Sequence, residues 1–135
     1  MPASGFYYRN TWLIVGAFLV LATIAGSLAP NLPEAPVTLN DKFLHLFVYG
    51  VLGSWFGALI SSRWWVLLAL LVLGLSLEFF QALGGSRHAE VLDMLANTCG
   101  ALVGVMVVGR SIAKPLLLAV DHFLAAAKNP ADTAP

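Results

Sequence analysis

Apolar residues form four long runs along the chain, and short polar or proline-rich segments separate them. A helix needs about 20 residues to cross a hydrocarbon core of roughly 30 Å, at about 1.5 Å per residue. All four runs reach or approach that length. The pattern therefore predicts four transmembrane helices, at Trp12–Leu28, Phe43–Ile60, Trp64–Leu83 and Val91–Gly109.

The segments between the runs indicate how these helices are connected. The sequence LAPNLPEAP keeps Pro30–Pro36 out of a helix, because proline lacks the backbone donor that a helix needs. Only Ser61–Arg63 separate the second run from the third, which predicts an antiparallel hairpin. After Arg110, apolar residues recur at helical spacing around Asp121 and His122. We expect a short amphipathic helix along the membrane interface there, with these two residues on its wet face.

Composition supports a membrane protein. Hydrophobic residues make up 59% of the 135 and charged residues 10%, whereas soluble domains average about 45–50% and about 25%. The formal net charge is zero, so we expect no nucleic-acid partner. The predicted fold class is an all-α integral membrane bundle of four transmembrane helices plus a short C-terminal interfacial helix. Residues 1–110 would form the membrane domain, and residues 111–135 the amphipathic helix and a flexible tail.

The first run has an alternative interpretation as a signal peptide. Arg9 would be its basic flank, and Ser27–Ala29 supply small residues for a cleavage site. The run is long for a signal core, and cleavage after Ala29 would leave Pro30 next to the cut. A transmembrane helix is therefore the preferred interpretation.

The distribution of cations predicts the orientation, because cytoplasmic loops carry the excess of Lys and Arg. With the N-terminus inside, the cytoplasmic segments hold Arg9, Arg63, Arg110 and Lys114, and the outer segments hold Lys42 and Arg87. We therefore expect both termini in the cytoplasm.

Polar residues gather at the predicted extracytoplasmic ends of the second, third and fourth helices. On each helix they are spaced three or four residues apart and are accompanied by glycines, so each set forms one stripe. The stripes are Lys42, His45, Tyr49, Gly53 and Gly57; Gly74, Glu78 and Gln81; and Asp93, Asn97, Gly100 and Gly104. Small residues let helices approach closely while polar groups bond across the contact. We expect the three stripes to face one another.

Glu78 is the most informative single residue. It lies five residues, or about 8 Å, from the end of its run. A charged side chain costs about 2.5–3.5 kcal/mol at a helix centre on insertion scales, so the carboxyl group needs a proton or a cation. Lys42, Arg87 and His45 are the predicted partners.

These positions resemble a known family. The sequence DKFLHLFVYGVLG, followed by GLSLEFFQALGGSRHAEVLDMLANTCGALVG, is similar to the VanZ-like family of small bacterial membrane proteins. Leu46 stands where the family often has Phe. The matching residues lie between 41 and 104 and are, in order, Asp41, Lys42, His45, Tyr49, Glu78, Gln81, Arg87, Asp93, Asn97, Gly100 and Gly104. The resemblance implies a multi-pass protein of the bacterial cytoplasmic membrane with a link to the cell envelope and, through the family's namesake, to teicoplanin resistance. It implies no reaction.

Three functions of the polar residues remain open. They can bind the head group of an envelope lipid or a related anionic or glycan ligand, with Lys42, His45 and Arg87 as donors. They can instead only lock the helices together. An intramembrane enzyme is the third hypothesis, with His45 as a general base. Ion transport is disfavoured because the inner halves of the helices carry no ionisable groups.

No catalytic residue, metal site or cofactor is predicted. The sequence has no H-x-x-x-H or H-E-x-x-H spacing and singles out no nucleophile. Cys99, the single cysteine, has apolar neighbours that predict a buried, inert thiol. The expected partners are membrane lipids and a lipid-linked envelope ligand, and nothing in the sequence specifies an oligomeric state.

Overall fold

Helices account for nearly all of the described chain. The computed structural model describes residues 5–29, 39–83 and 91–128, and these ranges contain no strand. The helices are α1 (Arg9–Leu28), α2 (Leu39–Leu59), α3 (Arg63–Leu83), α4 (Val91–Val103), the π-helix η1 (Gly104–Ala113) and α5 (Lys114–Lys128). Four helical segments, the fourth running from α4 through α5, are long and apolar enough to cross a membrane. The predicted all-α membrane bundle is confirmed.

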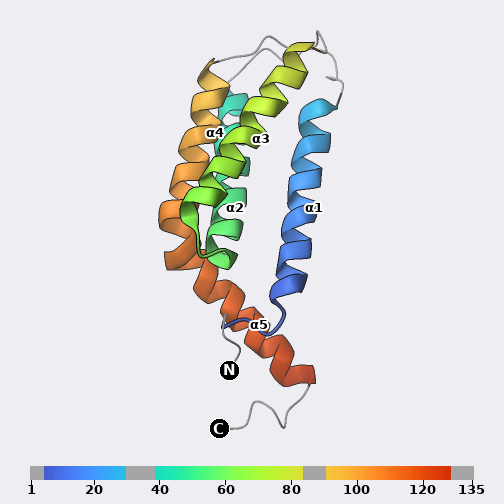
Figure 1. Cartoon of the computed structure of the whole chain (residues 1–135), viewed down its shortest axis with the longest axis vertical. Helices are drawn as coiled ribbons and strands as arrows, with labels where there is room; N and C mark the ends of the chain where they lie inside the picture. The colour runs from blue at the N-terminus through green and yellow to red at the C-terminus, as the bar shows by residue number, and fades with distance from the viewer. Residues whose placement is uncertain (1–4, 30–38, 84–90, 129–135) are drawn as a thin grey trace.

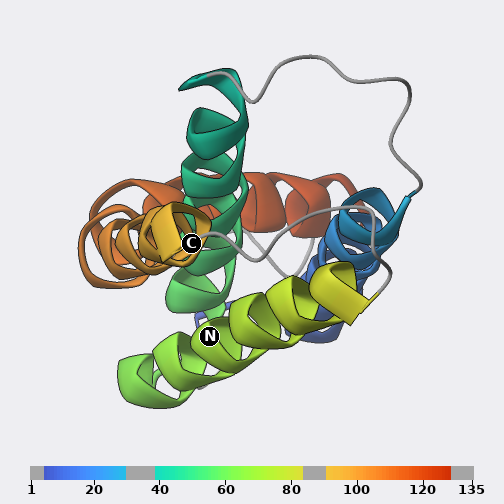
Figure 2. The same cartoon turned by 90° about the horizontal axis from the view of Figure 1, so that it is seen from above.

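Helices α1 to α4 run lengthwise through the molecule, with α2, α3 and α4 together on one side and α1 on the other (Figures 1 and 2). The starts of α2 and α4 lie at the same end as the last turn of α3, and α5 lies at the opposite end. We call the first of these the polar end. The polar end and α5 therefore lie at opposite ends of the described bundle.

The middle of the bundle is apolar. Side chains from α2, α3, α4 and η1 interlock there, and the fully or nearly fully buried ones are Tyr49, Leu52, Val66, Leu67, Leu70, Ala101 and Val105. Large apolar side chains such as Phe47, Trp64, Trp65, Leu75 and Phe79 point outward and are exposed on the protein surface. That distribution suits a bundle surrounded by lipid, where burial of apolar groups inside the protein is not the main driving force.

Helices α2 and α4 pack backbone against backbone through glycine. A Cβ atom on Gly100 would collide with the carbonyl oxygen of Leu46, and one on Gly104 would collide with that of Gly50. On Gly53 it would lie 2.9 Å from the carbonyl oxygen of Ala101. Backbone atoms cannot move aside as a flexible side chain can, so this approach requires glycine.

The predicted C-terminal helix after Arg110 is present as α5, but it is continuous with the fourth helix, which was predicted to end at Gly109. The helix continues without a break from Val91 to Lys128, through η1 and into α5. The wider π-helical turn and Pro115, which supplies no backbone donor, allow the helix to change direction. Helix α5 then crosses beneath α2 toward the start of α1 (Figures 1 and 2).

The prediction that Asp121 lies on a wet face is wrong, because its side chain is 0% exposed. Its carboxylate accepts hydrogen bonds from the backbone N–H of Tyr7 at 2.6 Å and of Tyr8 at 3.0 Å, and from Nε1 of Trp12 at 2.7 Å. Tyr8 precedes the first turn of α1 and makes no side-chain cap. Asp121 therefore caps α1 from another helix and also places negative charge at the positive end of the helix dipole.

The structure also bears on the predictions for His122 and Cys99. His122 is only partly exposed, and its Nε2 lies 3.0 Å from the carbonyl oxygen of Gly5. Cys99, predicted to be buried, is exposed. Its apolar neighbours in the sequence do not cover it, because they are exposed as well: Leu95, Leu102 and Val103.

Candidate functional site

The polar stripes of α2, α3 and α4 meet at the polar end of the bundle. Helices α2 and α4 begin at this end, and α3 ends there. We call this group of side chains the polar cluster. Its members are Lys42, His45, Tyr49, Glu78, Asp93 and Asn97. The cluster therefore extends from the polar end of the bundle down to Tyr49, which also belongs to the apolar core.

An ion pair connects α2 to α4. Nζ of Lys42 lies 2.6 Å from Oδ1 of Asp93, and the two side chains are 23% and 7% exposed. Asp93 is in the first turn of α4, where the helix dipole also favours a negative charge. The carboxylate is therefore held inside the cluster, while the lysine lies at its rim.

His45 and Asn97 make a second link between the same helices. Nδ1 of His45 lies 3.0 Å from Oδ1 of Asn97. A side-chain amide oxygen can only accept, so Nδ1 carries the proton in this arrangement. A neutral imidazole then has its lone pair on Nε2.

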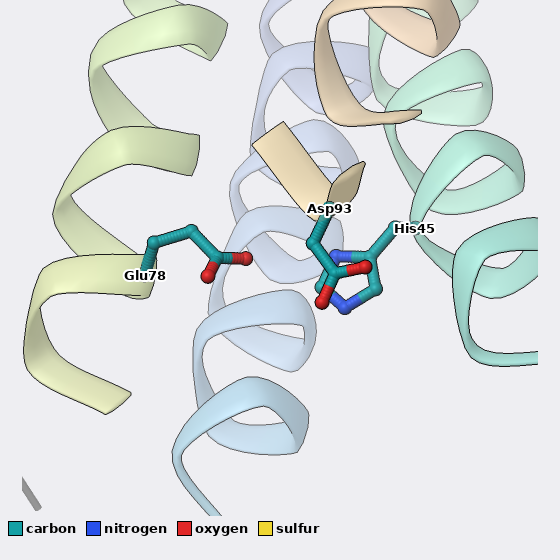
Figure 3. A group of neighbouring side chains, drawn as sticks. All are labelled: His45, Glu78 and Asp93. Atoms are coloured by element: carbon teal, nitrogen blue, oxygen red, sulfur yellow. The ribbon is translucent and has the colours of Figure 1, made fainter. Parts of the chain in front are cut away.

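Glu78 extends from α3 toward His45 and Asp93 (Figure 3). Glu78 is 4% exposed. One of its carboxylate oxygens lies within 4.8 Å of a ring nitrogen of His45 and of a carboxylate oxygen of Asp93. The carboxyl group thus faces polar side chains and not lipid, as the cost of burying a charge requires. Arg87, another predicted partner, lies outside the described residues.

Tyr49 lies one turn deeper than His45. The residue is 3% exposed, and its hydroxyl has no hydrogen-bond partner among the described residues. A Cβ atom on Gly74 would lie 3.2 Å from that hydroxyl and 3.4 Å from Nδ2 of Asn97. Gly74 therefore leaves the room that the phenol and the amide occupy.

The remaining predicted residues lie elsewhere. Gln81 is buried, but its Nε2 donates to the carbonyl oxygen of Ser27 at 2.8 Å and so joins α3 to α1 instead of joining the cluster. Asp41 is in the first turn of α2, and its side chain is outside the described part. Gly53, Gly57, Gly100 and Gly104 all lie at the contact of α2 with α4 and η1.

The sequence did not indicate an apolar groove beside the cluster. It has a volume of about 510 Å³ and is formed by α2, α4, η1 and α5. Leu46 and Phe47 line it near the polar end, Cys99 lines it on α4, and Leu116 and Leu117 line it at the opposite end. The groove depends on the turn of α5 beneath the bundle, which local periodicity cannot reveal.

The comparisons with known proteins identify a family. The family model described as VanZ/LLP1 matches residues 5–113, which include every described member of the polar cluster. The resemblance found in the sequence motifs is thereby confirmed. No curated protein and no solved structure matches the chain.

Proposed function

The chain belongs to the VanZ/LLP1 family, and from that premise we propose that it binds the anionic head group of an envelope lipid at the polar cluster. In this proposal the protein is a multi-pass component of the bacterial cytoplasmic membrane, with the polar end facing outward. The cation distribution supports that orientation.

The observation that carries the proposal is the layering of the cluster. Lys42 is at the rim with 23% of its side chain exposed, while Glu78, Asp93 and Asn97 are buried behind it. An ammonium group has three N–H donors and can therefore bond to more than one anion. A phosphate or carboxylate arriving from the membrane surface would meet this donor first.

The apolar groove supports a lipid over a free anion. It starts at Leu46, which directly follows His45, and continues along α2 to Trp55, roughly 14 Å away at the rise of an α-helix. A hydrocarbon chain in the groove and a head group at Lys42 would be parts of one molecule. The chain adds affinity through contact area, and the cluster adds selectivity for charge.

The same contacts also suit a purely structural function. The ion pair between Lys42 and Asp93 and the bond between His45 and Asn97 both join α2 to α4. If they serve only as helix links, loss of one should lower stability and any cellular function together. Binding predicts that the two effects separate.

Native mass spectrometry of the full chain in detergent tests this proposal, with phosphatidylglycerol and phosphatidylcholine of the same acyl chains as probes. We expect phosphatidylglycerol to be retained preferentially, and Lys42→Met to weaken its binding about tenfold, as loss of a charge-assisted bond implies. Lys114→Met, at the opposite end of the bundle, should bind normally. Equal retention of the two lipids, or equal losses in both variants, would contradict head-group recognition.

We further propose that head-group binding affects the response of cells to teicoplanin. A strain that lacks the protein, complemented with wild type or with Lys42→Met at equal abundance, provides the test. A change in susceptibility that the wild type restores and the variant does not would support the link. Full restoration by the variant would separate any teicoplanin effect from the cluster.

A further inference from the structure

The polar cluster contains the ligand types of a divalent-cation site. His45 from α2, Glu78 from α3 and Asp93 from α4 each offer one ligand atom, and these atoms all lie within 4.8 Å of one another. Figure 3 shows the three side chains extending toward one another from three different helices. We propose that His45, Glu78 and Asp93 bind one first-row divalent cation, Zn²⁺ or Mn²⁺.

The spacing of the three groups allows an ion between them. At the upper limit of 4.8 Å for all three separations, an ion equidistant from the three atoms lies about 2.8 Å from each, and zinc bonds to oxygen and nitrogen are about 2.0–2.2 Å. Shifts of less than about 1 Å by each side chain close that difference. All three are side-chain groups on separate helices, so small rotations suffice.

The orientation of His45 favours metal binding. Its Nδ1 lies 3.0 Å from Oδ1 of Asn97, and in the tautomer whose Nδ1 donates to that oxygen the lone pair is on Nε2. Histidines that bind metals almost always donate their other ring N–H to a neighbouring acceptor in this way. Asn97 would then be a positioning residue for the ligand.

Tyr49 provides an independent indication of a ligand. Its hydroxyl is buried and has no hydrogen-bond partner in the described part of the chain. Side chains on a helix tilt toward its N-terminus, so Tyr49 on α2 leans toward the cluster, and Glu78 on the antiparallel α3 leans down to meet it. A cation or a group bound to it would meet this hydroxyl.

Lys42 does not exclude the ion. It contacts Oδ1 of Asp93, and a carboxylate has a second oxygen with its own lone pairs. Two carboxylates with one imidazole suit Zn²⁺ or Mn²⁺, whereas Mg²⁺ and Ca²⁺ prefer oxygen ligands alone and thiolates suit softer ions. Three protein ligands also leave a coordination position open, as sites that bind exogenous groups do.

The test uses metal ions alone, without added lipid, and therefore stands apart from the head-group proposal. The full chain carries Cys99→Ser, His88→Gln and His122→Gln and no histidine tag, so His45 is the remaining one of its three histidines. After treatment with a chelator and its removal, the protein in detergent is titrated with Zn²⁺ by calorimetry. Mn²⁺ binding is followed by electron spin-echo spectroscopy, which detects a coordinated ¹⁴N nucleus.

We expect one Zn²⁺ per chain and ¹⁴N modulation of bound Mn²⁺. Glu78→Gln and His45→Gln in that background should each raise the dissociation constant for Zn²⁺ at least tenfold, on the scale of changes around metal sites, and His45→Gln should abolish the ¹⁴N signal. Circular dichroism and size exclusion establish that each variant is folded. If a variant does not fold, the background protein decides alone: no bound Zn²⁺, or Mn²⁺ bound without ¹⁴N modulation, overturns the proposal. If both folded variants bind Zn²⁺ as tightly as the background protein does, the proposal is overturned as well.

Discussion

The two polar regions of the protein place buried carboxylates in very different surroundings. At the α5 end, Asp121 is fully buried, and three N–H groups from one short segment donate to it at 2.6–3.0 Å. At the polar end, Glu78 and Asp93 lie near a lysine at the rim, a histidine and a tyrosine hydroxyl without a hydrogen-bond partner in the described chain.

This difference separates a structural contact from a candidate site. Asp121 accepts from two backbone amides and one indole, and it is fully buried. The polar cluster mixes donors and acceptors from three helices and exposes part of Lys42. Buried polar groups are normally satisfied, so the region with an unsatisfied hydroxyl is the one where a ligand is expected.

The largest effect should come from Asp121→Ala. The change leaves three donors without their acceptor at a buried position, which costs on the order of 3–5 kcal/mol. Thermal unfolding in detergent should show a large fall in Tm. Ser76→Ala is the control, because that hydroxyl only bonds back to Val72 within α3. If Asp121→Ala unfolds like wild type, the comparison between the two regions fails.

Gly100→Ala should have an intermediate effect. Its Cβ would collide with the carbonyl oxygen of Leu46, so α2 and α4 must separate, at a cost of about 1–3 kcal/mol. Separation should also weaken ligand binding at the polar cluster and leave the contacts of Asp121 intact. Gly26→Ala is the matched control: nothing lies within 4 Å of its Cβ position, and alanine favours a helix by up to about 1 kcal/mol. Equal effects of the two changes would disprove the close backbone contact.

The smallest effect on stability should come from Tyr49→Phe. The hydroxyl makes no hydrogen bond in the described chain, so its removal should leave Tm unchanged or raise stability by up to about 1 kcal/mol. If the hydroxyl serves a ligand, binding at the polar cluster should nevertheless weaken. A clear loss of stability would show that this hydroxyl has a structural partner and would make the two polar regions alike.

Much of the fold was predictable because it depends on local patterns. The helices follow from apolar runs of membrane-spanning length, and the facing stripes follow from polar and small residues three or four positions apart. The gathering of Lys42, Glu78 and Asp93 at one end needs only these two facts and the short connection between α2 and α3. The family motif independently indicates the same residues.

Other features depend on contacts between distant segments. The donors to Asp121 lie 109 to 114 residues away, and two of them are backbone amides, which carry no sequence signal. The grouping of His45, Glu78 and Asp93 has no local spacing because each comes from a different helix. Exposure of Cys99 depends on which face of α4 meets α2, and apolar neighbours look the same on either face of a membrane helix.

The capping of α1 by Asp121 also has a consequence for the order of assembly. A ribosome makes Tyr7 and Tyr8 more than a hundred residues before the carboxylate that binds their amides. The apolar segments can enter the membrane before that bond exists, and α1 keeps an uncapped end until α5 is complete. The contact that fastens the beginning of the described chain is therefore among the last to form, and a nascent chain that stops before residue 121 would hold all of the polar cluster in a bundle that is still open.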